Sequence, residues 1–222
     1  TYVITCFIYF HKAKLYLFII NPMLNFHQHV EGEQSMDGLT EFPYELRESI
    51  TLYEVINASF NHLTYIPEEI PLRIPHLTKL VLSYNKIDSL PDTFLLFFHL
   101  RELDLDHNQL TTIPKPLTQL LTLEKLALSH NVINEVPSDI ENMQSLTRLN
   151  LSHNKLNSVA VQSLAMCPLK VLLLHNNQLS KPPQHVCNEG QSISFYNLRL
   201  GTASLVCLGS LKTVHSAQMF TG

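Results

Sequence analysis

Asparagine returns along this chain at a nearly constant interval, and that interval restricts the fold more than any other feature. Six asparagines are separated by 24 residues once and by 23 residues four times. Five of them follow leucines in the pattern L-x-x-L-x-L-x-x-N, and a weaker first copy has Tyr53, Ile56 and Ala58 in place of the leucines. Repetition at about 20 to 50 residues is typical of solenoids, in which each repeat is one structural unit. The six predicted structural asparagines are Asn61, Asn85, Asn108, Asn131, Asn154 and Asn177.

The spacing within each repeat predicts a short strand followed by a turn. The second and third leucines are two residues apart, which is the period of a β-strand, so both point to one side. The asparagine follows where the chain leaves the strand, and its amide can satisfy backbone groups that the bend buries. The return limb often carries a proline, as at Pro91 and Pro137, which suits the start of a helical turn.

One such repeat cannot bury its apolar face alone, so neighbouring repeats must stack into a continuous core. We therefore predict an α/β solenoid of about six repeats plus a half-repeat beginning at Leu39. Its parallel strands form a concave sheet, and short helical or 3-10 turns lie on the convex side. Residues 37–187 form this domain. Residues 1–36 are an atypical cap, a disordered segment or non-native sequence, and residues 188–222 are a carboxyl-terminal cap and tail.

Composition excludes several classes of function. The chain has 15 Lys and Arg against 19 Asp and Glu, a formal charge of −4, so no positive field favours nucleic acid. The four cysteines form no C-x-x-C pair, which indicates a reducing compartment rather than a zinc knuckle or a disulfide framework. The apolar segment 2–20 is split by His11, Lys12 and Lys14 into runs too short to span a membrane.

The sequence contains no arrangement of residues that is typical of a catalytic site. Only 6 glycines are present and none builds a phosphate loop, and no Ser, His and Asp group stands outside the repeat positions. We expect no enzyme activity and no cofactor.

The full repeat, L-x-x-L-x-L-x-x-N-x-L-x-x-[ILV]-P, resembles the leucine-rich-repeat family, specifically its cytoplasmic Ras-group type with 23-residue repeats, as in Sur-8-like and Scribble-like scaffolds. The resemblance covers Leu39 to Cys187, although Ala160 stands where a proline is expected and Pro182 replaces an apolar anchor. It implies a curved solenoid that binds proteins on its concave sheet, in the cytoplasm, with a small GTPase or a signalling enzyme as candidate partners.

Side chains that point out of the concave sheet form four columns, with one residue from each repeat in every column. We expect this concave strip, with aromatic residues at one end and Arg148 toward the other, to bind a protein partner through a few anchor residues. An ordinary solvated sheet surface is the alternative. The candidate protein-binding residues are Lys79, Tyr84, Glu102, Asp104, Asp106, His107, Lys125, His130, Arg148, Asn150 and His153.

Three of these candidates, His107, His130 and His153, fall in register about 4.8 Å apart on adjacent strands. A metal site is geometrically conceivable there, but no carboxylate or thiolate completes the coordination, so we expect no metal. A milder hypothesis is that binding changes with pH as this row charges near pH 6.

The sequence thus predicts a non-catalytic scaffold or adaptor in intracellular signalling. One alternative is the recognition arm of a larger enzyme, such as a kinase or a ubiquitin ligase, of which this chain is a fragment. A second alternative is an extracellular receptor-type ectodomain.

Overall fold

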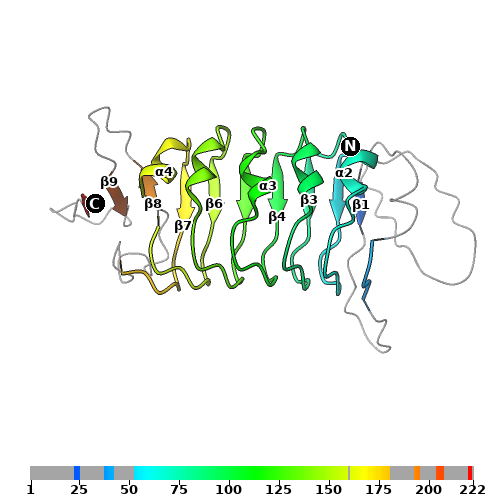
Figure 1. Ribbon diagram of the computed structural model, residues 1–222, viewed down its shortest axis with the longest axis horizontal. Coiled ribbons are helices and arrows are strands. Elements are labelled where there is room, and N and C mark those ends of the chain that lie inside the picture. The colour runs from blue at the N-terminus through cyan, green and yellow to red at the C-terminus, as the bar shows by residue number, and fades with distance from the viewer. Residues whose placement is uncertain are drawn as a thin grey trace, which may run out of the picture.

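The computed structural model describes residues 23–25, 38–42, 53–159, 161–180, 193–195, 204–207 and 220–221, and the account below concerns these residues. Their strands lie in one sheet in the order of the sequence, from β1 to β10 (Figure 1). The strands are β1 Met23–Asn25, β2 Val55–Asn57, β3 Lys79–Val81, β4 Glu102–Asp104, β5 Lys125–Ala127, β6 Arg148–Asn150, β7 Val171–Leu173, β8 Ile193–Phe195, β9 Ser204–Cys207 and β10 Phe220–Thr221.

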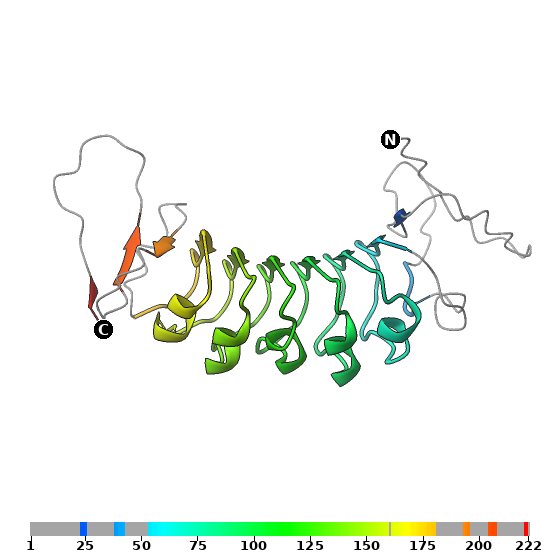
Figure 2. The same ribbon diagram turned by 90° about the horizontal axis from the view of Figure 1, so that it is seen from above.

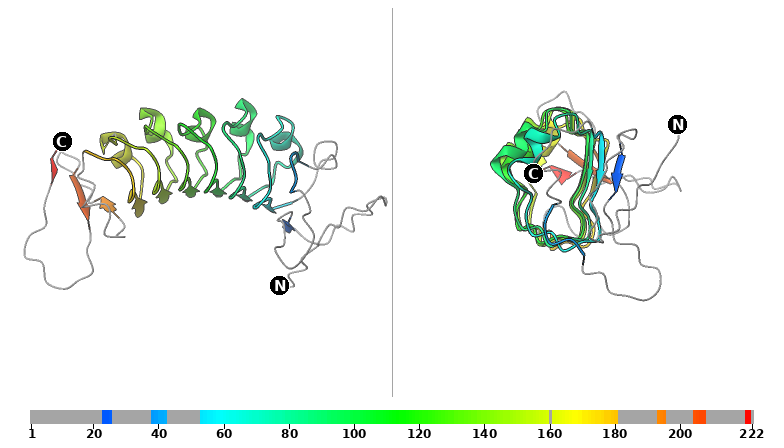
Figure 3. Two further views of the ribbon diagram at one scale, coloured as in Figure 1. Left: turned by 90° about the horizontal axis from the view of Figure 1, so that it is seen from below. Right: turned by 90° about the vertical axis from the view of Figure 1, so that its right-hand side faces the viewer.

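Strands β2 to β7 are the six predicted repeat strands, and they pair in parallel without a slip in register. Leu80, for example, lies opposite Leu103, which lies opposite Leu126. The central residue of each strand is buried, while its two neighbours are half-buried or exposed. The predicted α/β leucine-rich-repeat solenoid is therefore confirmed. Figure 3 shows the arc that these repeats form, with the strands on its inner side.

The predicted asparagines occupy the bend after each strand and bond to the backbone of two repeats. Asn131 Nδ2 donates to the carbonyl oxygens of Leu128 at 3.1 Å and Ser129 at 3.2 Å in its own repeat. The same group donates to Leu105 O of the preceding repeat at 2.9 Å, and Asn131 Oδ1 accepts from Leu110 N at 3.0 Å. Because these backbone groups are buried, each asparagine supplies partners that water cannot. We call this series the asparagine ladder.

The return limbs form short helices along the outer side of the arc (Figure 2). Prolines directly precede three of them: Pro91 before η1 and Pro137 before η2, as the sequence predicts, and Pro114 before α3. Each limb inserts one or two apolar side chains beneath the sheet, such as Phe94 and Ile140, which are fully buried. The helices are α2 Ile70–Arg73, η1 Asp92–Leu96, α3 Lys115–Thr118, η2 Ser138–Asn142 and α4 Val161–Met166.

The predicted half-repeat packs on the first complete one. Phe42 is buried in the core, Leu39 N donates to Asn61 Oδ1 at 2.9 Å, and Leu39 O accepts from His62 N at 2.9 Å. Strand β1 pairs in parallel with β2, so three residues of segment 1–36 extend the sheet.

At the other end of the sheet the direction of pairing changes. Strand β7 pairs with β8 in antiparallel fashion, as do β8 with β9 and β9 with β10. The predicted limits of the terminal segments, together with Ala160 and Pro182, lie outside the described residues. Within the part that the structure describes, no helix is long and apolar enough to cross a membrane.

Candidate functional site

The concave face carries a row of charged side chains at the first position of the middle strands. Lys79 Nζ lies 3.0 Å from one carboxylate oxygen of Glu102, and Lys125 Nζ lies 2.5 Å from the other. The hydrogen bonds from Lys125 and Lys79 lower the pKa of Glu102 below its usual value, with Lys125 the larger cause. Arg148 follows Lys125 in register on the next strand. We call Lys79, Glu102, Lys125 and Arg148 the charge row.

Asp104 and Asp106 stand beside the charge row on the chain that leaves β4. Asp104 Oδ1 accepts from Asp106 N at 3.0 Å, and Asp106 Oδ1 accepts from Ser129 N at 2.5 Å. Burial raises the pKa of Asp106, and the neighbouring Asp104 charge adds to that effect. Asp106 therefore has a structural role in the turn, while Asp104 faces the concave side as a half-buried carboxylate.

Asn150 repeats this arrangement two strands further along the solenoid. Its side-chain oxygen accepts from Ser152 N at 3.2 Å and from Ser152 Oγ at 2.8 Å. The carbonyl end of Asn150 is thus committed to the turn, and Arg148 is the exposed side chain of this strand.

The column after these residues does not face outward as predicted. In four repeats it holds a serine with an exposed fraction of only 3 to 7%. The chain has begun to bend at this position, so the side chain turns toward the backbone, where it can bond an Asn as in Ser152. The prediction that this column belongs to the binding surface is wrong for these four residues, which are Ser59, Ser83, Ser129 and Ser152.

The next column forms a continuous stack of rings along the edge of the concave face. Ring centroids are separated by 4.3 Å from Phe60 to Tyr84 and by 4.0 Å from Tyr84 to His107. The stack continues with 4.0 Å from His107 to His130 and 3.9 Å from His130 to His153, and all four pairs are within 13° of parallel. We call these five residues the ring stack.

Every residue of the ring stack has a backbone φ between 53° and 60°, in the left-handed region that most residues avoid. Asn176 takes the sixth position of the column with a φ of 53°, and its Nδ2 lies 3.0 Å from His153 Nε2. The repeat spacing places the histidines in register but does not predict this backbone conformation. Only Asn176 indicates it, because asparagine tolerates positive φ better than most residues.

Stacking determines the chemistry that the histidines can perform. Ring nitrogens bind metals along directions in the plane of the ring, and parallel rings about 4 Å apart do not aim those directions at one point. Among the described residues, no group of three or more His, Cys, Asp or Glu could hold a metal ion. Burial and the neighbouring histidines His107, His153 and His175 lower the pKa of His130, so its neutral form is favoured.

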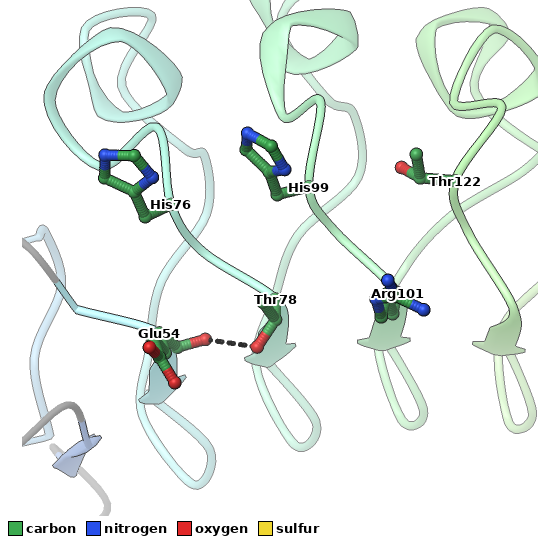
Figure 4. Close-up of a pocket in the computed structure, with 6 residues that line it drawn as sticks. All are labelled: Glu54, His76, Thr78, His99, Arg101 and Thr122. Atoms are coloured by element: carbon green, nitrogen blue, oxygen red, sulfur yellow. Dashed lines mark hydrogen bonds between the residues drawn. The ribbon is translucent and has the colours of Figure 1, made fainter.

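A shallow pocket of about 430 Å³ lies on the opposite edge of the sheet, where the chain enters the strands (Figure 4). Arg101 in this pocket pairs with Glu124, and Glu54 adds a second carboxylate. Thr78 donates its hydroxyl to Glu54 O at 2.9 Å, and Thr122 donates to Leu100 O at 3.0 Å. Because Arg101 is already paired with Glu124 and both threonine hydroxyls bond to backbone oxygens, this pocket is a weaker candidate than the concave face.

Comparison with known proteins finds similar repeats in other proteins. A family model described as "Leucine rich repeat" matches residues 54–110 and 98–156. A solved leucine-rich-repeat protein of Leptospira interrogans is similar to this chain, with 33% sequence identity and a TM-score of 0.55. The match covers 62% of this chain and 35% of that protein, so this chain spans about a third of its relative's length. A search of curated proteins finds no match.

Proposed function

We propose that the repeat region of this chain is a leucine-rich-repeat domain that binds a protein partner across the concave face as a non-catalytic scaffold. Leucine-rich-repeat domains generally mediate protein–protein interaction, and curved solenoids present an extended concave surface for it. Repeats of this kind are typically binding modules rather than enzymes.

The observation that carries the proposal is that some columns of the repeat are buried and others are exposed. The leucines and the asparagine ladder are buried and hold the fold, whereas the charge row and the ring stack lie outside the core. Tyr84 keeps an exposed fraction of 45% and Phe60 of 46%, although both are large aromatic residues. Exposed aromatic and arginine side chains are enriched among the anchors of protein interfaces.

The class of partner is proposed from a resemblance. The 23-residue period resembles the Ras-group repeats, and on that resemblance we propose a small GTPase or a signalling enzyme as the partner and the cytoplasm as the location. The recognition arm of a larger enzyme and a receptor ectodomain remain the alternatives. All three use the same face, so the test below concerns the face itself.

The test compares two triple variants that remove the same kinds of side chain from opposite faces. Tyr84→Ala, Asp104→Asn and Arg148→Gln together alter the concave face. Phe98→Ala, Asp139→Asn and Lys115→Gln alter exposed positions on the flank and the convex side. Both proteins are first compared with wild type by thermal unfolding, since only folded variants are informative.

Quantitative affinity capture from the native cell then ranks the proteins bound by each chain. We expect the specific partners to be lost with the concave variant and retained with the control variant. Equal capture by a folded concave variant would contradict binding through this face.

A further inference from the structure

The charges of the concave face are not all balanced within the protein. Glu102 uses both carboxylate oxygens on Lys79 and Lys125, so one negative charge serves two positive ones. Arg148 has no ion-pair partner among the described residues, and it is exposed. Its neighbour across the sheet on one side is Lys125, a second cation. The charge row therefore ends in a positive region at β5 and β6.

The surroundings of Arg148 favour a pairing that excludes water. Val171 lies beside it in register on β7, and the neighbouring column holds Asn150 between Ala127 and Leu173. The apolar side chains supply no hydrogen-bond acceptor, and the side-chain oxygen of Asn150 already accepts from Ser152. An arginine fork binds a carboxylate through two parallel N–H···O bonds, and such bonds strengthen when water is excluded.

An opposite charge lies two strands away. Asp104 on β4 has no ion pair among the residues that the structure describes, and it aligns in register with Ala127 and then with Asn150. Strands in a sheet are about 4.8 Å apart, so Asp104 and the strand of Arg148 are separated by about 10 Å. That distance corresponds to about two turns of an α-helix or three residues of an extended strand.

We propose that the concave face binds a protein segment with a carboxylate side chain against Arg148 and a basic side chain against Asp104. The two charges set the direction in which the segment crosses the strands, because reversing it would place like charges together. This inference rests on the proposed function and adds the chemistry of the partner.

The probes are peptides selected from a random display library on the immobilised full-length chain. Soluble Ala127→Arg protein is present as a competitor. Its added side chain blocks the centre of the concave face but leaves the other surfaces unchanged, so it removes peptides that bind elsewhere. Enriched peptides are synthesised and their affinities measured for wild type and for Arg148→Gln, Asp104→Asn and Lys115→Gln. Lys115 is an exposed cation on α3, so its variant controls for net charge. Each variant is checked for wild-type thermal unfolding.

We expect the enriched peptides to share an acidic residue, and Arg148→Gln to weaken their binding by about tenfold or more, which is about 1.4 kcal/mol. Replacing that acidic residue of the peptide by its amide should weaken binding to the wild-type protein by a similar factor. The amide peptide should then bind the Arg148→Gln variant almost as well as it binds the wild-type protein. The basic residue of the peptide should couple to Asp104 in the same way, and Lys115→Gln should leave every affinity unchanged.

The outcomes separate this inference from the proposed function. Peptides that Ala127→Arg blocks but that lack an acidic residue, or that bind Arg148→Gln as tightly as wild type, overturn the inference and leave concave binding in place. Failure to enrich any peptide that Ala127→Arg blocks counts against both.

Discussion

The asparagine ladder and the ring stack occupy adjacent positions of the same turn, yet they serve the molecule in different ways. Asn131 is buried, and its amide makes three donor bonds and accepts a fourth. His130, one residue earlier, is exposed, and its ring faces contact His107 and His153. The ladder position demands one side chain because it serves fixed backbone groups. The stack position demands a backbone conformation and accepts several side chains.

The largest expected effect comes from breaking the ladder. Asn131→Ala leaves the Leu110 N–H and three carbonyl oxygens short of a buried partner, so the free energy of unfolding should fall by about 3 to 5 kcal/mol. Urea unfolding measures the change. Asn142→Ala, at an exposed asparagine of the same region, is the control and should cost under about 0.5 kcal/mol. A similar loss from both variants would contradict a special role for the ladder.

A smaller effect separates backbone from side chain in the ring stack. His130 has a φ of 53°, which a β-branched residue adopts only with strain, whereas asparagine occupies the equivalent position at Asn176. Both His130→Val and His130→Asn remove the ring, so their difference isolates the backbone. The valine variant should be less stable than the asparagine variant by about 1 to 2 kcal/mol in the same urea experiment. Equal stabilities would show that the turn relaxes around the substituted residue.

The smallest effect is the part of the dependence of stability on pH that comes from the ring stack. Partial desolvation within the stack and the neighbouring imidazoles lower the pKa of folded His130, so the unfolded chain takes up its proton first as pH falls below about 6.5. The stability present above that pH is therefore lost as pH falls toward the lowered pKa. The urea midpoint should fall more between about pH 7.5 and 5.5 for wild type than for His130→Asn.

A carboxyl on the neighbouring repeat also makes stability depend on pH and can be removed from the comparison. The raised pKa of Asp106 acts with the opposite sign, because protonating a buried carboxyl favours the folded state at acidic pH. An Asp106→Asn background removes this contribution. Identical pH profiles for wild type and His130→Asn in that background would show that the stack does not resist protonation.

Residues whose role is set by the repeat itself could be predicted from the sequence. The leucine pairs, the asparagine ladder and the register of Lys79 with Glu102 and Lys125 follow from a 23-residue period and the alternation of a strand. Ser129 marks where this reasoning fails, because alternation no longer applies once the chain bends. The parallel rings of the stack were also missed, since a left-handed φ has no signature in residues such as His107.

The bonds of the asparagine ladder reach one repeat back and no further. Asn154, for example, bonds Leu128 O of the preceding repeat and Leu151 O and Ser152 O of its own. The repeats between Tyr53 and Ser180 therefore behave as a linear array in which each repeat is coupled to its nearest neighbours. A partner bound across β4, β5 and β6 would stabilise the repeats that it contacts and their nearest neighbours. Amide hydrogen exchange should therefore slow in these repeats and stay unchanged in the more distant ones.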